Sequence, residues 1–101
     1  MSPRETGPSG FKARLIKNIK SSFPECVIFL TDAGYVQGAP DIIVLCRDKW
    51  AALEVKATEK SSKRPNQLWW VNQLNDMSYS SFVYPENEEV VLNDLQITFG
   101  A

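Results

Sequence analysis

The N-terminal part of the chain alternates apolar and polar residues with the period of an α-helix. Apolar residues recur every three or four positions, at Phe11, Leu15, Ile16, Ile19 and Phe23. The lysines between them fall on the other faces of the same helix. Ser9 suits the N-cap, and Pro24 suits the end of this element. The pattern predicts an amphipathic helix that begins at Phe11, after a flexible lead-in over residues 1–10 that contains two prolines and two glycines.

Short runs of apolar and β-branched residues follow, and they are typical of buried strands. They cover residues 26–30, 41–46, 49–56 and 81–84. Pro65 favours the first turn of a helix that extends to about Met77, and an acidic first turn favours a last helix over residues 88–95. The expected order is αβββαβα. It predicts a single α/β domain over residues 11–101, with a central mixed sheet flanked by helices.

The composition narrows the chemistry that this domain can perform. The chain has 101 residues, no histidine and two cysteines, Cys26 and Cys46. Without histidine or a CxxC pair, the chain has almost nothing from which to build a zinc site, and an imidazole-based catalytic apparatus is excluded. Both cysteines lie in apolar runs, so we expect buried free thiols in a reducing, cytoplasmic compartment. No apolar run approaches the roughly 20 residues that span a membrane, and we expect no membrane partner and no secretory signal.

Charge is distributed unevenly along the chain, although the net charge is only −1. Basic residues dominate residues 1–24 and 56–75, whereas acidic residues dominate residues 25–55 and 76–101. Binding of phosphate groups requires a local basic patch and not a basic total. Nucleic acid therefore remains a candidate partner, and the other interpretation of each basic run is a solvated lysine face.

Three charged residues stand at the ends of the two central strands. If Arg47 and Asp48 form a two-residue turn, Asp41 on one strand pairs with Glu54 on the next, and Lys56 projects from the same face. Paired side chains lie about 4.5–5.5 Å apart, close enough for two carboxylates to share one cation. A slip of one residue would separate them onto opposite faces, and the turn sequence alone does not fix the register.

Each of these residues also has a simpler interpretation. Asp41 follows Pro40 and could be a turn residue, and Glu54 and Lys56 could be the solvated face of a strand. Taken together, two carboxylates beside apolar strands favour a hard divalent cation such as Mg²⁺, which binds one or two carboxylates and retains several waters.

The segment Gly38-Ala39-Pro40-Asp41, followed by Glu54-Val55-Lys56, resembles the motif of the PD-(D/E)XK nuclease superfamily. The chain is most similar to the VRR-NUC (virus-type replication-repair nuclease) branch and to its compact phage members. Three further stretches carry this resemblance: Gln37 to Asp41, Trp50 to Glu54, and Arg64-Pro65-Asn66-Gln67. The similarity covers roughly residues 11–96. It implies a restriction-endonuclease-like αβββαβ core with a C-terminal helix.

The resemblance also implies roles for individual residues. Asp41, Glu54 and the Val55 carbonyl would ligate Mg²⁺ or Mn²⁺. Lys56 would orient or help to deprotonate the attacking water. Gln67 matches a family glutamine near the active site, or it is an ordinary helix-surface amide.

The chain departs from the family pattern at the first helix. Related nucleases place a further acid on that helix, but residues 9–23 contain none. Glu5, just ahead of the helix, is the nearest candidate for the missing catalytic acid. Asp32 and Gln37 also resemble family positions, although Asp32 suits a turn better than a metal site.

The expected activity is that of a metal-dependent endodeoxyribonuclease. The resemblance to small phage members, and not the motif, further implies that it acts on branched DNA such as a Holliday junction, as a homodimer. The DNA-binding residues would be Lys12, Lys17, Lys60, Lys63 and Arg64. Of the adjacent Trp69 and Trp70, one should be in the core, and the other could cover a partner subunit. Two alternatives remain open: a non-catalytic nucleic-acid-binding module that keeps the nuclease fold, and a nuclease that acts on RNA.

Overall fold

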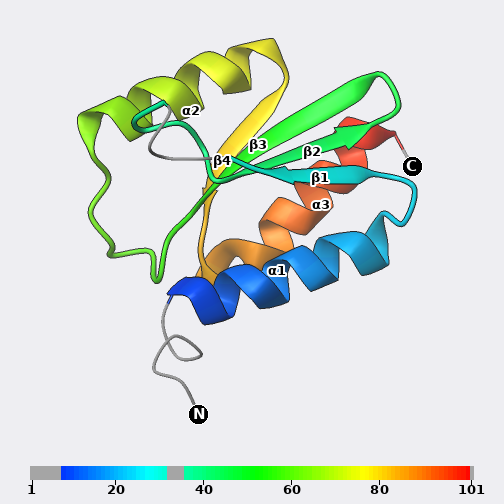
Figure 1. Cartoon of the computed structure of the whole chain (residues 1–101), viewed down its shortest axis with the longest axis horizontal. Coiled ribbons are helices and arrows are strands. Elements are labelled where there is room, and N and C mark those ends of the chain that lie inside the picture. Colours follow the sequence, from blue (N-terminus) through cyan, green and yellow to red (C-terminus); the bar gives the residue numbers. More distant parts are fainter. Residues whose placement is uncertain (1–7, 32–35, 101) are drawn as a thin grey trace.

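The computed structural model describes residues 8–31 and 36–100, which form an α/β fold with one mixed sheet and three helices (Figure 1). The helices are α1 (Pro8–Ser22), α2 (Pro65–Met77) and α3 (Glu88–Phe99), with a short 3₁₀ turn, η2 (Pro85–Asn87), before α3. The strands are β1 (Val27–Leu30), β2 (Ile42–Cys46), β3 (Lys49–Val55) and β4 (Tyr79–Val83). The α/β class and the mixed sheet are as predicted. Of the predicted lead-in over residues 1–10, residues 1–7 (Glu5 among them) lie outside the described residues, as does Asp32, whereas residues 8–10 belong to α1.

The sheet has the strand order β1-β2-β3-β4. The first three strands are antiparallel neighbours, whereas β4 runs parallel to β3. Parallel neighbours need a crossover connection, and α2 provides it between β3 and β4. The C-terminal end of β3 lies close to the start of α2, because Glu54 and Lys56 both hydrogen-bond to Gln67 in the first turn of that helix.

The hairpin between β2 and β3 has the predicted register. Leu45 pairs with Trp50, and Ile42 pairs with Leu53. Arg47 in the turn has a φ of 61°, which is uncommon for a residue with a side chain. Its guanidinium donates hydrogen bonds to Glu25 (3.1 Å) and to the Phe99 carbonyl (2.7 Å). These contacts connect the unfavourable turn to residues outside the hairpin, and they stabilise the register of β2 against β3.

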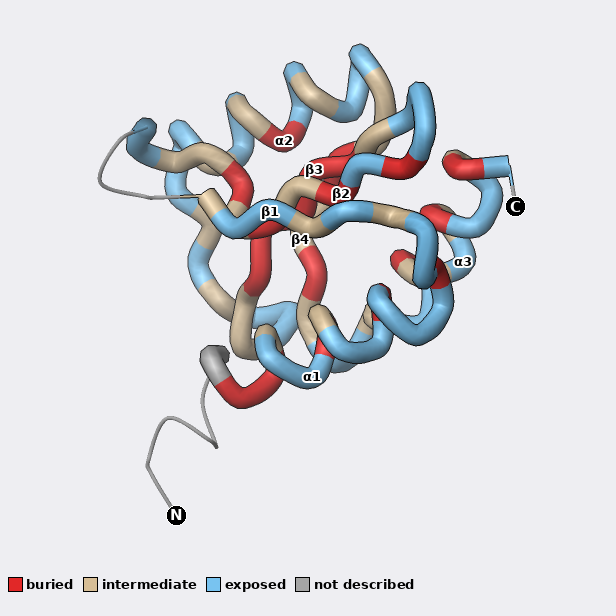
Figure 2. The backbone as a smooth tube through the Cα atoms, turned by 45° about the vertical axis from the view of Figure 1, so that its right-hand side comes forward, coloured by how far each residue is buried: buried red, intermediate tan, exposed pale blue. Residues whose placement is uncertain are grey.

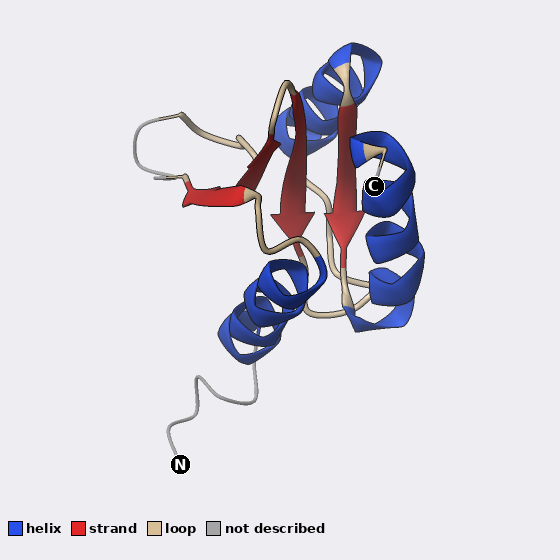
Figure 3. Cartoon of the chain, turned by 90° about the vertical axis from the view of Figure 1, so that its right-hand side faces the viewer, coloured by secondary structure: helices blue, strands red, loops and turns tan. Residues whose placement is uncertain are grey.

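The two faces of the sheet are covered differently (Figures 1 and 3). Helices α1 and α3 pack on one face and enclose the main core with alternate residues of β2 and β3. Helix α2 packs on the opposite face, where it buries Val71 near β3 and β4. Figure 2 shows that burial is concentrated on the central strands and on the helix sides that face them. The residues of that main core are Phe11, Leu15, Ile19, Phe23, Ile42, Val44, Cys46, Ala51, Leu53, Val55, Val83, Val91, Leu95 and Phe99.

Several predicted boundaries are wrong by one turn or less. The first helix begins at Pro8, so Ser9 lies within it and is not its N-cap. β4 starts at Tyr79, and its first residues are polar or half-buried. The last helix continues to Phe99, whose burial extends the apolar stripe by one turn, and it ends at Gly100 in the left-handed conformation. No helix in the described part of the chain has the length and apolarity to cross a membrane.

The cysteines do not remain free thiols, as the sequence analysis expected, but form a disulfide between Cys26 and Cys46. The reason is the register of β1 and β2, in which Val27 pairs with Leu45. Cys26 and Cys46 are the next pair of residues in this register, and their Cα atoms are 4.4 Å apart. This separation lies within the range that a disulfide requires. Because the two cysteines are paired, they no longer support the expectation of a reducing compartment, which rested on free thiols.

Candidate active site

Asp41 lies directly before β2, one residue beyond the last pair of the β2–β3 ladder. Its main chain extends the sheet, because its carbonyl accepts a hydrogen bond from the Thr31 amide (2.9 Å). Its side chain reaches across to β3, where Oδ2 accepts a hydrogen bond from the Val55 amide (2.8 Å). This hydrogen bond holds the Asp41 carboxylate against the C-terminal end of β3.

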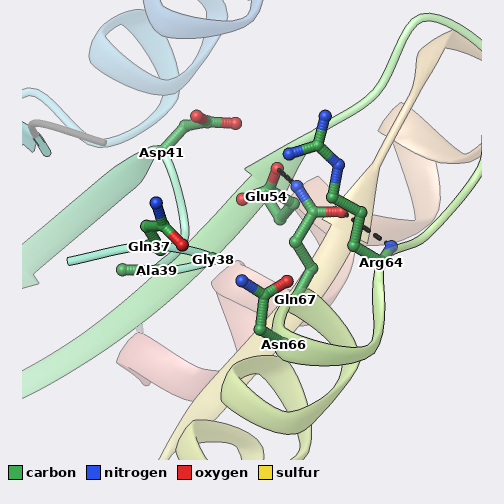
Figure 4. Close-up of a pocket in the computed structure, with 8 residues that line it drawn as sticks. All are labelled: Gln37, Gly38, Ala39, Asp41, Glu54, Arg64, Asn66 and Gln67. Atoms are coloured by element: carbon green, nitrogen blue, oxygen red, sulfur yellow. Dashed lines mark hydrogen bonds between the residues drawn. The ribbon is translucent and has the colours of Figure 1, made fainter. Parts of the chain in front are cut away.

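Glu54 lies on β3 at the same end of the sheet and is 5% exposed. Its Oε2 atom accepts a hydrogen bond from Nε2 of Gln67 (2.9 Å) (Figure 4). Its other oxygen, Oε1, is buried and has no hydrogen-bond partner among the described residues. A buried carboxylate oxygen without a partner is costly, so this atom is the clearest indication of a missing ligand.

Asp41 and Glu54 line one pocket of about 240 Å³. Figure 4 shows that its walls come from the segment before β2, from β3 and from the first turn of α2. The predicted one-face arrangement of the two carboxylates is therefore present. The lining residues are Gln37, Gly38, Ala39, Asp41, Glu54, Arg64, Asn66 and Gln67.

The environment of Glu54 raises the pKa of its carboxyl group from 4.5 to about 7. Burial is the largest cause, because it disfavours the charged form, and the nearby negative charge of Asp41 adds to it. Lys56 and Lys12 act in the opposite direction. A carboxyl group held in this way gains a proton at neutral pH unless a further positive charge is supplied.

Gln67 connects the carboxylate to the lysine. Its Oε1 atom accepts hydrogen bonds from Lys56 Nζ (2.8 Å) and from the Arg64 amide (3.1 Å), while its Nε2 donates to Glu54. The three contacts fix which end of the amide faces which charge. Gln67 is thus part of the site and not an ordinary surface amide.

The basic residues expected to bind DNA fall into three groups. Lys12 on α1 is close to the pocket, with Nζ 4.0 Å from Asp41 Oδ1, and Arg64 lines the pocket itself. Lys63 lies over the rings of Phe82 and Tyr84, at 5.3 Å and 5.7 Å from their centroids. Lys17 and Lys60 are exposed and do not line this pocket.

The donors of the pocket fit a hard divalent cation. Two carboxylates, one with an unpartnered buried oxygen, are a donor set that Mg²⁺ accepts when water and substrate complete its coordination. The described residues hold no cluster of three or more Asp, Glu, Cys or His side chains around one point. Glu5, the predicted further acid, lies outside the described residues, so its role stays a prediction.

Gly38 and Asn66 form a contact that the sequence analysis did not identify. Gly38 has a φ of 82°, and a Cβ atom at this position would lie 2.7 Å from Cγ of Asn66. Close packing of the segment before β2 against α2 therefore requires glycine. The only feature of the sequence that indicates this contact is a glycine two residues before Pro40. This glycine does not indicate that Asn66 is the residue that it contacts.

The tryptophans on α2 are placed differently from the prediction. Trp69 is exposed, Trp70 is half-buried, and the buried residue of the helix is Val71. The two indole rings pack edge to face, with centroids 5.0 Å apart. Neither tryptophan is therefore a core residue.

The chain matches no protein-family model, and comparisons with curated proteins and with solved structures also find no match.

Proposed function

We propose that the protein is a metal-dependent endonuclease that hydrolyses phosphodiester bonds in DNA, with a restriction-endonuclease-like core of the VRR-NUC type. The observation that carries this proposal is the buried Oε1 of Glu54, which has no hydrogen-bond partner in the part of the chain that the structure describes. Glu54 lies beside Asp41 and is linked through Gln67 to Lys56. A packing role alone would not leave a buried carboxylate oxygen without a partner.

Asp41, Glu54 and the Val55 carbonyl would hold Mg²⁺ or Mn²⁺. When bound, the cation would stabilise the negative charge that develops on the phosphate oxygens. Lys56, with Nζ 2.8 Å from Gln67 Oε1, would orient the attacking water and offset the charge that develops on the phosphate oxygens. The water oxygen would form a bond to phosphorus and lose its proton to solvent. The P–O bond to the leaving nucleotide would break, and the leaving oxygen would take up a proton from solvent. Arg64 at the rim would offset the charge of the phosphate.

The substrate that we propose is branched DNA. Lys12 and Arg64 supply cations beside the carboxylates, and Lys63 lies in the neighbouring groove between α2 and β4. Contacts of such cations to phosphates position a nucleic acid without reading its sequence. The compartment that we propose, the cytoplasm (that of the host for a phage-encoded protein), rests on the resemblance to phage nucleases alone, because the Cys26–Cys46 disulfide removes the argument from free thiols.

We further propose that the active form is a homodimer. The face of β1 and β2 opposite the main core exposes Val27 (53%), Phe29 (55%) and Leu45 (37%). Contiguous apolar side chains of this kind are typical of protein interfaces. A two-fold dimer would also supply two sites, which cutting both strands of a junction requires.

A second candidate function is a non-catalytic nucleic-acid-binding module. It is favoured by the absence of a third metal-binding side chain among the described residues. Metal affinity separates the two candidates. In the nuclease, Asp41→Ala weakens Mn²⁺ binding measured by calorimetry, whereas a vestigial module shows no such dependence.

The decisive test is cleavage of junction, flap and linear DNA, with parallel RNA substrates, in Mg²⁺ or Mn²⁺. We expect Lys56→Ala to lower the cleavage rate by about 10²–10³-fold, the usual contribution of a group that stabilises charge developing in the transition state. Lys49→Ala is the matched control, because Lys49 is an exposed lysine at the hairpin turn, at the other end of β3. Folded wild-type protein that cuts no substrate with either metal would eliminate the nuclease proposal.

A further inference from the structure

A second groove, of about 380 Å³, lies between α2 and β4. The helix contributes Leu68, Val71, Asn72 and Asn75, whose spacing places them on one stripe of α2. The opposite wall comes from β4 and the turn after it. The residues of this wall are Ser80, Ser81, Phe82, Tyr84 and Asn87, with Lys63 from the loop before α2. The volume lies within the range of about 300–1,000 Å³ that is usual for small-ligand sites.

This groove adjoins the candidate active site. Phe82 pairs with Glu54 across the β3–β4 ladder, so the two side chains are neighbours on the same face of the sheet. Lys63 and Arg64 are consecutive, and Lys63 lines the groove whereas Arg64 lines the active-site pocket. A polymer of phosphate-linked units that binds with one phosphate in the active-site pocket would therefore have its neighbouring unit within reach of the groove.

The lining offers two kinds of contact. Phe82 and Tyr84 present aromatic rings, over which Lys63 Nζ lies at 5.3 Å and 5.7 Å. Both rings are half-buried, and a cation over a ring that solvent still reaches contributes only on the order of 1 kcal/mol, so a base that stacks on the rings can displace the ammonium group at little cost. Beside the rings, the Asn72 amide can donate to or accept from the edge of a base. Asn75 uses its Oδ1 to accept from the Ser80 amide, and its Nδ2 can still donate to a base.

The chemistry of β4 argues against a peptide strand as the occupant. The Ser80 amide already donates to Oδ1 of Asn75 (3.0 Å), and the Phe82 carbonyl already accepts from Nδ2 of Asn87 (3.1 Å). These side chains occupy backbone groups that an added β-strand would need.

We propose that this groove binds one unpaired nucleotide adjacent to the scissile phosphate. Its base would stack on Phe82 and Tyr84, and Lys63 would contact its phosphate. The inference rests on the proposed nuclease function and deepens it, because a site for a single unstacked base selects DNA with unpaired nucleotides beside the cut, such as flaps and branch points.

The first test measures binding without cleavage, in EDTA, by fluorescence anisotropy of labelled single-stranded oligothymidylate. We expect the double variant Phe82→Leu, Tyr84→Leu to bind the oligonucleotide at least about tenfold more weakly than the wild type, because it loses the free energy of base stacking on the aromatic rings. Trp69→Leu is the matched control, since Trp69 is an exposed aromatic residue of α2 outside the groove, and it should bind as the wild type does. Equal affinity of the wild type and a folded double variant would overturn the proposal, as would an equal loss in Trp69→Leu.

A second variant covers the case in which the double variant does not fold. Lys63→Gln leaves both rings in place and removes one cation from the half-buried loop. We expect weaker binding, with a salt dependence reduced by about one phosphate contact. An unchanged affinity and salt dependence would count against the groove.

The third test separates the groove from the nuclease proposal. Removal of the base next to the cut in a flap substrate should slow cleavage by the wild type about tenfold and leave the double variant unaffected. If the double variant cuts the intact flap at the wild-type rate, the groove proposal is wrong and the nuclease proposal stands. If no substrate is cut, the nuclease proposal is wrong, and the anisotropy measurement still decides whether the groove binds a nucleotide.

Discussion

Oε1 of Gln67 lies 2.8 Å from Nζ of Lys56. The ammonium group is thereby held by a neutral acceptor and not by a carboxylate. The same amide donates to Glu54, so the position of the lysine is linked to the position of the carboxylate. This arrangement makes Gln67 a positioning residue for the charges that flank the pocket.

Gln67→Leu should lower the rate constant for cleavage about ten- to a hundredfold and leave Km for DNA nearly unchanged, because it removes the orientation of Lys56 and not a contact with DNA. Gln67→Glu keeps the shape but replaces the donor toward Glu54 with an acceptor, so it should not rescue activity. Single-turnover kinetics of both variants, with Gln73→Leu on the exposed side of α2 as control, measure this effect. An equal loss in Gln73→Leu would show that the effect is not local.

Glu54→Gln should stabilise the protein in EDTA above neutral pH. The folded state holds the pKa of Glu54 at about 7, above its ordinary 4.5, so folding favours the protonated form. This contribution is fully present below pH 4.5 and is lost as the pH rises to 7, by up to about 3 kcal/mol. Urea unfolding at pH 5 and pH 8 should show a gain for Glu54→Gln that grows with pH. Glu86→Gln, at an exposed glutamate, is the control and should show no such trend.

Gly38→Ala should destabilise the protein by about 1–3 kcal/mol, from the left-handed backbone together with the close approach of Asn66. Gly100→Ala is a matched control. Gly100 also has a positive φ (65°), but an added Cβ there meets no described atom within 4 Å, so only the backbone cost remains. The double variant Gly38→Ala, Asn66→Ala should recover the packing part of the loss in urea unfolding. If Gly38→Ala costs no more than Gly100→Ala, the contact with Asn66 is unimportant.

The disulfide between Cys26 and Cys46 should raise the free energy of unfolding by about 3 kcal/mol relative to the reduced protein, as expected for a bridge that closes a loop of moderate length. Urea unfolding with and without reductant measures the difference. The double variant Cys26→Ala, Cys46→Ala should not respond to reductant. Two reactive thiols in the oxidised, denatured wild type would show that the bridge does not form.

The sequence correctly predicted that Asp41 and Glu54 lie on the same face of the sheet. The turn sequence Arg47-Asp48, however, does not by itself explain the register on which this placement depends. A two-residue turn at Arg47 places them together, and the spacing leaves few other registers that bury alternate residues. What holds that turn is the set of contacts of Arg47 with Glu25 and Phe99, from distant parts of the chain. Local sequence patterns cannot reveal such contacts.

Two other features depend on distances between elements and were not predictable from the pattern. The cysteine pairing follows from the register of β1 against β2 across a long loop, which alternation of apolar residues does not fix. The bridging contacts of Gln67 depend on where the crossover places the first turn of α2 above the end of β3. Apolarity alone favoured a tryptophan as the buried residue of α2, but the smaller Val71 fits against the sheet.

The exposed apolar face of β1 and β2 leads to a prediction about assembly. Phe29 is 55% exposed and pairs with Ile43, so a charge at this position would project from the middle of the face without disturbing the main core. Phe29→Asp should convert a homodimer into a monomer in light scattering after size-exclusion chromatography, because burial of an unpaired carboxylate in an interface is unfavourable. Val90→Asp is the control, since Val90 is also exposed but lies on α3, on the other side of the sheet. Monomeric wild-type protein at micromolar concentration would refute the dimer, and loss of dimer in Val90→Asp alone would place the interface on α3.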